Sequence, residues 1–528
     1  MSELSPQTKK LIQHYQAWFK ALQPKEGRTV VHVDEVASKV AAFYEKIRGM
    51  IDWREEQLLR RSSIERILKR RLFLGQSGKG MAAPFVFELV RGGYFPNDRI
   101  EESKIEEVQR LIDKYIFIVQ NSPKPPEKRR RFMLYDWLLS LAACETEEIL
   151  DPLRRERALI DYMEEIMKER IDVVPQIPEI EKNIQLSIAT QKALFKLDNA
   201  IISYHLLKKR YSQWSNLPQL ELEVIAKNIY SIWEDIEKDF KHPLADKFYG
   251  ICERYDTPYL ILGDIISKDP LEIQEKLEKP ELLESFIREV YAKRKGKLKS
   301  RIRRAAFYST VSIFLTKILL ALAIEIPFDK YVSGQTDYQT MGLNVLIPSF
   351  LMFFLVSTIR QAKKSNLERV VLETIKICYS TERKNVYTIR APRKRRGIIN
   401  ALVNIFYLAT FAGSFWVIWW GLEKLNFGIL SKIIFLVFFS LISFAGTKIR
   451  ERAKELSIEE ENAGFFSFFL DAFSIPFIRV GKWLSSQWAR YNVILVIITA
   501  LFDMPFQLFT EFLEQWRNFV KEKKEEIH

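Results

Sequence analysis

Long runs of apolar residues in the second half of the chain alternate with stretches rich in lysine and arginine. The segment from Ala305 to Phe328 holds 24 mostly apolar residues, and a helix needs about 20 to cross the ~30 Å hydrocarbon core of a bilayer. Three further apolar runs occupy residues 343–359, 398–422 and 427–446. The pattern predicts four membrane-spanning helices within residues 305–446, and the short connection between the last two predicts a tight antiparallel hairpin.

Two more apolar stretches, within residues 464–490 and 492–510, contain charge. Asp471 falls inside the first and Asp503 inside the second. Apolar side chains recur on one helical face of the first stretch, with arginine and lysine off that face, which is typical of a helix in the headgroup layer. We expect two interfacial or re-entrant helices and a charged tail in residues 464–528. Helices that pack against the four spans would give the same periodicity.

The first 300 residues show the spacing of amphipathic helices. Apolar residues recur every three or four positions between Val33 and Ile51, as on one face of a helix. Ser62 with Glu65 three residues later is a capping-box pattern, which predicts a helix start. No series of positions alternates with the period of strands. The sequence therefore predicts an all-α protein, with a soluble helical region followed by a multi-pass membrane domain.

Proline and charge interrupt the helical spacing at "NSPKPPEKRRR". Such a break predicts a boundary between two soluble subdomains, residues 1–121 and 132–292. Residues 293–304 follow as a basic juxtamembrane segment, with eight lysines and arginines in twelve positions. Several units are expected for a chain of 528 residues, because single domains usually hold about 100–200.

The distribution of charge orients the predicted spans. Lys and Arg outnumber Asp and Glu by 81 to 67, a formal net charge of +14. Residues 360–397, between the second and third spans, hold twelve Lys and Arg against three Glu. Because such loops stay in the cytoplasm, we expect a plasma-membrane protein with both termini cytoplasmic. The lack of a secretory signal pattern and the three widely spaced cysteines agree with a reducing compartment.

Clusters of basic residues predict two kinds of contact. Those beside the spans are expected to meet anionic lipid headgroups: Arg301, Arg303, Arg304, Arg393, Lys394, Arg395 and Arg396. A cluster in the first subdomain is a candidate face for a cytoplasmic protein partner, or simply a solvated helical face: Arg60, Arg61, Arg66, Lys69, Arg70 and Arg71. Nucleic acid is a less favoured partner, because topology and lipids already explain the clusters beside the spans.

One lysine interrupts the first predicted span. Lys317 lies near the centre of residues 305–328, where insertion scales assign a lysine a penalty of about 2.5–3.5 kcal/mol. Its ammonium can snorkel along the helix, pair with an acid, or line a polar path. Glu325 lies two turns onward on almost the same face, and Asp471 and Asp503 are candidates if their segments enter the membrane.

The chain carries no recognisable catalytic motif. The "GQSGKG" stretch lacks the spacing and the preceding strand of a phosphate-binding P-loop. The five histidines form no close pair with metal-ligand spacing, and no nucleophile motif surrounds any serine or cysteine. We expect a non-enzymatic protein without a cofactor or metal.

Together these patterns predict a membrane protein that presents a cytoplasmic helical scaffold or interaction domain. Its expected partners are the lipid bilayer, including anionic lipids, and an unidentified protein on the cytoplasmic side. The alternative is a transporter or channel that the soluble domain regulates. The sequence indicates no oligomeric state.

Overall fold

The computed structural model describes the chain from residue 3 to residue 523, apart from these positions: 24–28, 37, 44–55, 74–77, 124, 153, 329, 332–337, 358–364, 380–385, 392–396, 459–464, 491–508, 510, 511, 514, 518, 521 and 522. The described residues are overwhelmingly helical, which confirms the all-α prediction. They form two compact units. The N-terminal unit comprises residues 2–275, 377–391 and 494–528, and the membrane unit comprises residues 276–376 and 392–493.

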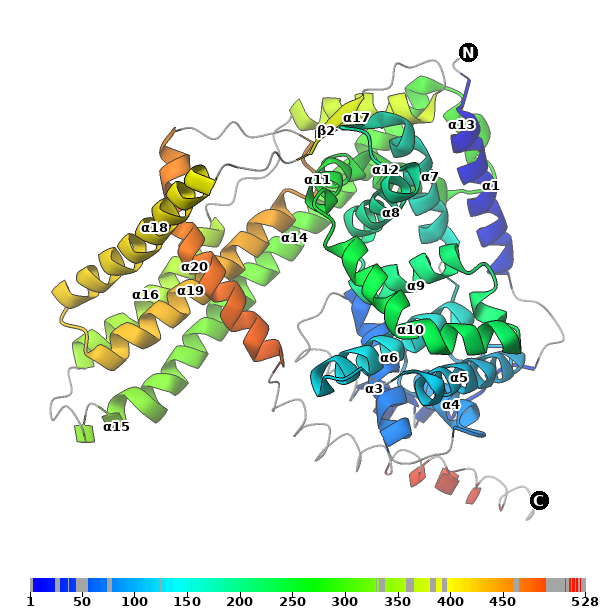
Figure 1. Ribbon diagram of the computed structural model, residues 1–528, viewed down its shortest axis with the longest axis horizontal. Helices are drawn as coiled ribbons and strands as arrows, with labels where there is room; N and C mark the ends of the chain where they lie inside the picture. Colours follow the sequence, from blue (N-terminus) through cyan, green and yellow to red (C-terminus); the bar gives the residue numbers. More distant parts are fainter. Residues whose placement is uncertain are drawn as a thin grey trace. The chain divides into compact units, whose positions relative to one another are not determined.

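The N-terminal unit is built from helices (Figure 1). In order they are α1 (Pro6–Ala21), α3 (Glu56–Phe73), α4 (Ala82–Arg91), α5 (Ser103–Asn121), α6 (Lys128–Leu150), α7 (Arg154–Arg170), α8 (Glu179–Phe195), α9 (Asn199–Arg210), η1 (Trp214–Asn216), α10 (Gln219–Phe240), α11 (Ala245–Arg254), α12 (Asp256–Lys268) and α13 (Ile273–Leu277). Those from α3 to α6 and from α8 to α10 share a large apolar core. The predicted boundary after residue 121 lies inside this unit, where α5 and α6 pack against each other.

The capping-box pattern at Ser62 does not begin a helix. Ser62 lies inside α3, because the apolar spacing that buries Ile64, Ile67 and Leu68 continues a helix already formed at Glu56. The residues just before Ser62 are already helical and none of them breaks the helix. The capping-box pattern therefore does not mark a helix start here. Of the helix predicted between Val33 and Ile51, positions 37 and 44–51 lie outside the described residues.

A short parallel sheet joins distant parts of the N-terminal unit. Strand β1 (Ile171–Val174) pairs with β2 (Tyr387–Arg390) in the register Ile171 with Tyr387 and Val174 with Arg390. The backbone N–H of Ser5 also donates to the carbonyl of Cys378 at 2.8 Å. The segment 377–391, which follows the second apolar run, therefore belongs to the N-terminal unit rather than to the membrane unit.

The membrane unit holds the apolar helices. They are α14 (Pro280–Leu320), the π turn η2 (Ala321–Glu325), α15 (Ile326–Phe328), α16 (Tyr338–Ser357), α17 (Ser365–Cys378, which ends in the N-terminal unit), α18 (Gly397–Lys424), α19 (Ile429–Ala453) and α20 (Phe465–Arg490). Three described helices are long and apolar enough to cross a membrane: 280–328, 401–424 and 429–453. The second predicted span is an apolar helix too, but its apolar part, Gly342–Ser357, is shorter.

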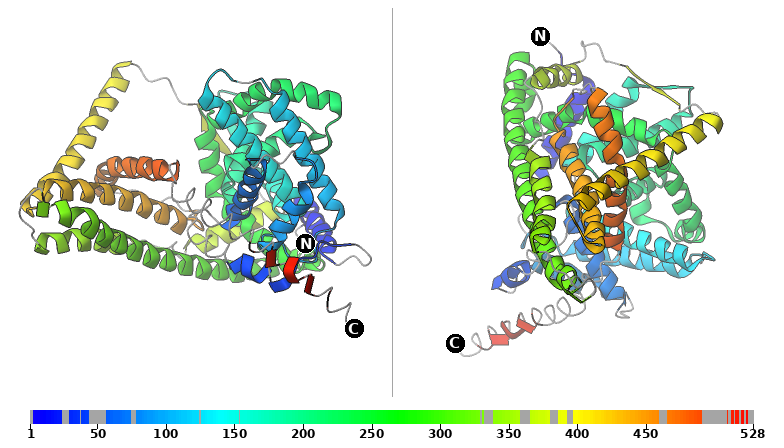
Figure 2. Two further views of the ribbon diagram at one scale, coloured as in Figure 1. Left: turned by 90° about the horizontal axis from the view of Figure 1, so that it is seen from below. Right: turned by 90° about the vertical axis from the view of Figure 1, so that its left-hand side faces the viewer.

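The first of the two charged apolar stretches forms the single helix α20, with Pro476 inside it. Figure 2 shows α20 running beside α19. The Phe477 side chain is fully buried, with its ring centroid 4.6 Å from that of Phe415 and 4.7 Å from that of Phe439. This packing favours the alternative in which the apolar face meets the spans. Most of the second stretch, residues 491–508, lies outside the described residues.

Candidate functional site

A closed polar network lies among the apolar helices of the membrane unit. The Lys317 ammonium donates to Oε1 of Glu325 at 3.1 Å and to Oδ1 of Asn344 at 2.9 Å. The three side chains are 0%, 1% and 0% exposed. The sequence places Lys317 and Glu325 on one helix, and the structure brings them into contact. In the structure the Lys317 side chain is thus paired with an acid on its own helix.

Two further groups complete the network around the Glu325 carboxylate. Asn344 Nδ2 donates to its Oε2 at 2.5 Å, and the Ser431 hydroxyl donates to the same oxygen at 3.1 Å. The Phe438 ring lies 5.3 Å from the Lys317 ammonium, within the range of a cation–π contact. Both carboxylate oxygens and the ammonium have partners, so the network links α14, η2, α16 and α19 through satisfied polar groups.

The π turn η2 aligns the two charges. In a regular α-helix, residues eight apart differ in direction by about 80°, since each residue turns by about 100°. A π turn closes hydrogen bonds to the fifth residue and turns less per residue. The η2 turn at Ala321–Glu325 therefore rotates Glu325 back toward the face of Lys317. Periodicity in the sequence gives no signal for this turn.

Asn344 and Ser431 were not singled out from the sequence. Their signal was available, because each is a polar residue close to the start of an apolar run, where polar groups tend to face other helices. The other predicted partners of Lys317 are not part of the described network. The Asp471 side chain and the whole of Asp503 lie outside the described residues.

The predicted lipid-contacting arginines that are described lie on α14. Arg301, Arg303 and Arg304 are exposed, just before the apolar part of this helix. Residues 393–396, the other predicted cluster, lie outside the described residues. Lipid contact by these side chains stays a prediction.

The basic cluster of the first subdomain makes contacts within the fold. Arg70 and Arg71 bind the two oxygens of Glu88, at 2.5 and 2.6 Å. The other members bind groups on helices and loops of the same unit: Arg60 with Glu147 and Asp151, Arg61 with Glu65 and Asp198, Arg66 with Tyr94, and Lys69 with Asp136. These pairs account for the clustering of charge within the fold.

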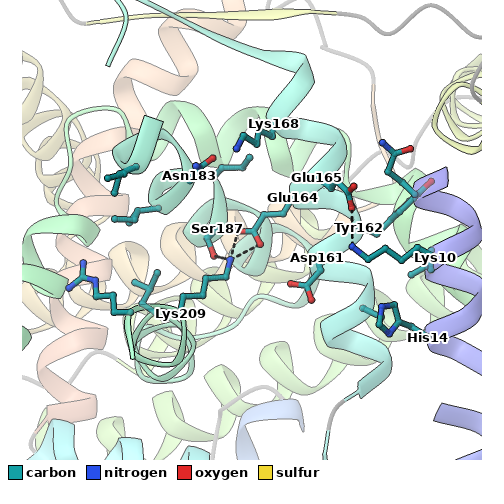
Figure 3. Close-up of a pocket in the computed structure, with 18 residues that line it drawn as sticks. Lys10, His14, Asp161, Tyr162, Glu164, Glu165, Lys168, Asn183, Ser187 and Lys209 are labelled. Carbon is teal, nitrogen blue, oxygen red and sulfur yellow. Dashed lines mark hydrogen bonds and ion pairs between the residues drawn. The ribbon is translucent and has the colours of Figure 1, made fainter. Parts of the chain in front are cut away.

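The N-terminal unit contains a pocket of about 610 Å³ between α1, α7, α8 and α9 (Figure 3). Charges of both signs line it, together with apolar side chains that include Leu11 and Ile184. The Lys10 ammonium lies 3.7 Å from the Glu165 carboxylate on one side. On the other side, Lys209 donates to both oxygens of Glu164 at 2.7 Å. The volume falls in the range of binding pockets.

A serine and a lysine meet in this pocket. Lys209 Nζ donates to Ser187 Oγ at 2.9 Å, and serine–lysine pairs serve as nucleophile and base in some hydrolases. A base must be neutral to accept the hydroxyl proton. The Lys209 ammonium also donates to both oxygens of Glu164. The arrangement is therefore that of an ion pair that also fixes a serine.

Burial keeps a histidine near the pocket neutral. Loss of solvation, with the charges of Arg157, Lys208 and Lys209 adding to it, lowers the pKa of His205 well below 6.5. Its Nδ1 is 2.5 Å from Oε1 of Gln191, an acceptor, so Nδ1 carries the proton. Gln191 Nε2 in turn donates to Ser187 Oγ at 3.2 Å. The serine is thus held by a chain of polar contacts that extends into the core.

Within the described ranges, no group of three or more His, Cys, Asp or Glu side chains is arranged to hold a metal ion. Cys144, Cys252 and Cys378 are buried free thiols, and burial raises the pKa of each. Compared with known proteins, the chain matches no family model, no curated protein and no solved structure.

Proposed function

We propose that the chain is a multi-pass membrane protein whose N-terminal helical unit is a scaffold or interaction module at the cytoplasmic face. The β1–β2 pairing is the observation that carries this proposal. It joins residues 171–174, which precede the first apolar helix, to residues 387–390, which follow the second. One folded unit is thus assembled from segments that precede and follow two apolar helices in the sequence.

This pairing supports a fourth span. Segments that fold together lie on the same side of a membrane, so the chain crosses an even number of times between them. If α14 crosses outward, α16 is the described apolar helix available for the return. Its 20 residues rise about 30 Å, the thickness of the hydrocarbon core. Local thinning of the bilayer accommodates the short apolar part.

Charge supports a cytoplasmic location for the N-terminal unit. Residues 293–304 and 360–397 flank the apolar parts of α14 and α16 and carry the strongest excess of Lys and Arg. Basic loops stay on the cytoplasmic side during insertion. The turn between α18 and α19, with few charges, then lies outside, and both termini are cytoplasmic in a plasma-membrane protein.

The pocket supports the binding role of the N-terminal unit. It combines apolar side chains with paired charges, as sites for peptides or small ligands do. We assign it to a protein partner on the cytoplasmic side, in a non-enzymatic interaction. The basic residues of α3 act inside the fold in this account.

A transporter or channel is the second candidate, because a charged network lies at a π turn inside an apolar helix. Intramembrane charges and π turns are frequent at functional sites. Ion flux through proteoliposomes separates the two functions. A scaffold shows the same flux as empty liposomes, with or without the substitution Lys317→Leu. A flux that exceeds this background and is lost in Lys317→Leu would overturn the scaffold proposal.

A further inference from the structure

We propose that α14 and the carboxyl end of α19 form a binding site for the headgroup of an anionic phospholipid. The site surrounds a small depression of about 10 Å³, lined by Tyr291, Lys295, Leu298, Lys299 and Ile302 of α14 and by Ala453 and Leu456 at the end of α19. We call it the α14–α19 cleft. The proposal rests on the membrane insertion proposed above and adds a specific ligand to it.

The cleft lies where the apolar packing of the two helices ends. Ile302 and Ala306 of α14 pack on a cluster that contains Ile442 and Ile449 of α19. The exposed surface of α14 becomes aromatic directly after the cleft, with Phe307 64% and Tyr308 67% exposed. Aromatic residues at such a transition mark the membrane–water interface. The cleft is therefore at the level of the phospholipid headgroups.

Both α14 and the end of α19 carry positive charge at the level of the headgroups. Residues 293–304 contain eight basic and no acidic residues, and residues 448–455 contain four basic residues and two glutamates. Lys299, Arg303 and Arg450 are among the exposed members. Basic clefts between helices on the cytoplasmic side match the charge of phosphate headgroups. A zwitterionic headgroup offers no net charge to this surface.

Hydrogen bonds hold the two walls of the cleft together. Asn366 Nδ2 donates to the Tyr291 hydroxyl at 3.0 Å and to the Leu456 carbonyl at 2.5 Å. The backbone N–H of Ile458 donates to Asn366 Oδ1 at 2.8 Å. Asn366 is 0% exposed. The walls are thus fixed before a ligand binds, which reduces the entropy lost on binding.

The apolar residues of the cleft select a lipid rather than a free anion. Leu298 and Ile302 are half-buried and contribute hydrocarbon surface beside the two lysines, whereas Ala453 and Leu456 are buried. A phospholipid uses both features, because its glycerol and upper acyl chains contact apolar groups while its phosphate binds ammonium. Inorganic phosphate uses only the charges.

The test is thermal unfolding of the purified full-length protein in neutral detergent. Phosphatidylglycerol, phosphatidylcholine and inorganic phosphate are titrated separately. We expect phosphatidylglycerol to raise the unfolding midpoint, as a ligand of the folded state does, and the other two to leave it unchanged. In Lys295→Gln/Lys299→Gln, we expect the half-saturating concentration of phosphatidylglycerol to rise about fivefold for each lysine.

A matched control removes two exposed lysines from the N-terminal unit. Lys20→Gln/Lys227→Gln makes the same change in net charge, at positions that are exposed, and should respond like the unaltered protein. Equal shifts with phosphatidylglycerol and phosphatidylcholine, or an unchanged response in Lys295→Gln/Lys299→Gln, would overturn the proposal. Neither result bears on membrane sidedness, which is measured separately by labelling.

Discussion

Lys317 and Glu325 form an ion pair inside the first apolar helix, with Nζ and Oε1 3.1 Å apart and both side chains enclosed. The pair is shared with Asn344 of α16 and Ser431 of α19. A lone charge among apolar helices is strongly unfavourable, whereas a satisfied pair is tolerated. The network therefore fixes which faces of the three helices meet.

Removal of one charge from this pair should destabilise the membrane unit. In Lys317→Leu, the Glu325 carboxylate loses its cation, and we expect the free energy of unfolding to fall by about 3–5 kcal/mol. In Lys317→Leu/Glu325→Leu, no charge is left alone and most of this loss should be recovered. Thermal unfolding of the purified variants in detergent measures both effects.

The neighbouring substitution Thr316→Leu is the control, because Thr316 is exposed and its hydroxyl donates only locally, to the Ser312 carbonyl. A change within about 0.5 kcal/mol is expected there. A Lys317→Leu protein as stable as the unaltered one would mean that the lysine snorkels. A more stable one would mean that the lysine is retained for a path through the helices.

Loss of the Asn366 side chain should destabilise the membrane unit where α14, α17 and the end of α19 meet. Asn366→Ala removes three hydrogen bonds and leaves the buried N–H of Ile458 without its acceptor. We expect a loss of about 2–3 kcal/mol, measured by thermal unfolding. Asn228→Ala on α10 removes an exposed amide that donates to the carbonyl of its own helix and should be nearly neutral. Equal effects of the two substitutions would contradict this role.

The contact between α19 and α20 can be tested with a pair of glycines. A Cβ at Gly481 would overlap the backbone carbonyl of Ser440, whereas one at Gly413 of α18 would meet nothing within 4 Å. Gly481→Ala should therefore separate the two helices and lower the unfolding midpoint. Gly413→Ala should be neutral or raise stability by about 0.5–1 kcal/mol, because alanine is the better helix former. Stabilisation by both would mean that α20 does not pack on α19.

Acid should weaken the N-terminal unit through His205. Its imidazole is held neutral in the fold, with a pKa well below 6.5, whereas in the unfolded chain it takes up a proton near pH 6.5. Below that pH the unfolded state binds the extra proton, so stability falls by up to about 1.4 kcal/mol per pH unit until the folded-state pKa is reached. Unfolding midpoints between pH 7.5 and 5.5 measure the slope.

Two variants test whether His205 causes this pH dependence of the unfolding midpoint. His205→Gln retains a donor for Gln191 but no titrating group, so its midpoint should depend less on pH. His14→Gln, at an exposed position of the pocket rim, should keep the slope of the unaltered protein. The assignment fails if both variants show the same pH dependence.

The broad architecture could be predicted from the sequence because it rests on composition and periodicity. The apolar runs around residues 305–328, 398–422 and 427–446 appear as long apolar helices. The role of segment 377–391 could not be predicted, since the β1–β2 pairing joins residues more than 200 positions apart. Strand pairing at that separation leaves no local signal in so short a strand.

The candidate site was predictable only in part. A lysine within an apolar run demands a partner, and its helical spacing placed Glu325 on almost the same face, where a polar path or a bridging water could link the two. The contribution of Asn344 depends on how α16 packs, and the exact alignment depends on the π turn η2. Likewise, the pairing of Arg70 and Arg71 with Glu88 depends on the packing of α3 on α4, which a count of basic residues does not reveal.

The central claim is that α14 and α16 carry the chain across the membrane and back to the N-terminal unit. Labelling of single cysteines with an impermeant maleimide on intact cells tests it most directly, with the three native cysteines replaced by alanine. Four exposed positions are used: Leu220 and Val386 of the N-terminal unit, Tyr331 before α16, and Leu425 between α18 and α19. We predict labelling of Tyr331→Cys and Leu425→Cys in intact cells, and of Leu220→Cys and Val386→Cys only after permeabilisation. Two results would contradict this claim. One is labelling of Val386→Cys in intact cells while Leu220→Cys stays protected. The other is protection of Tyr331→Cys together with Val386→Cys.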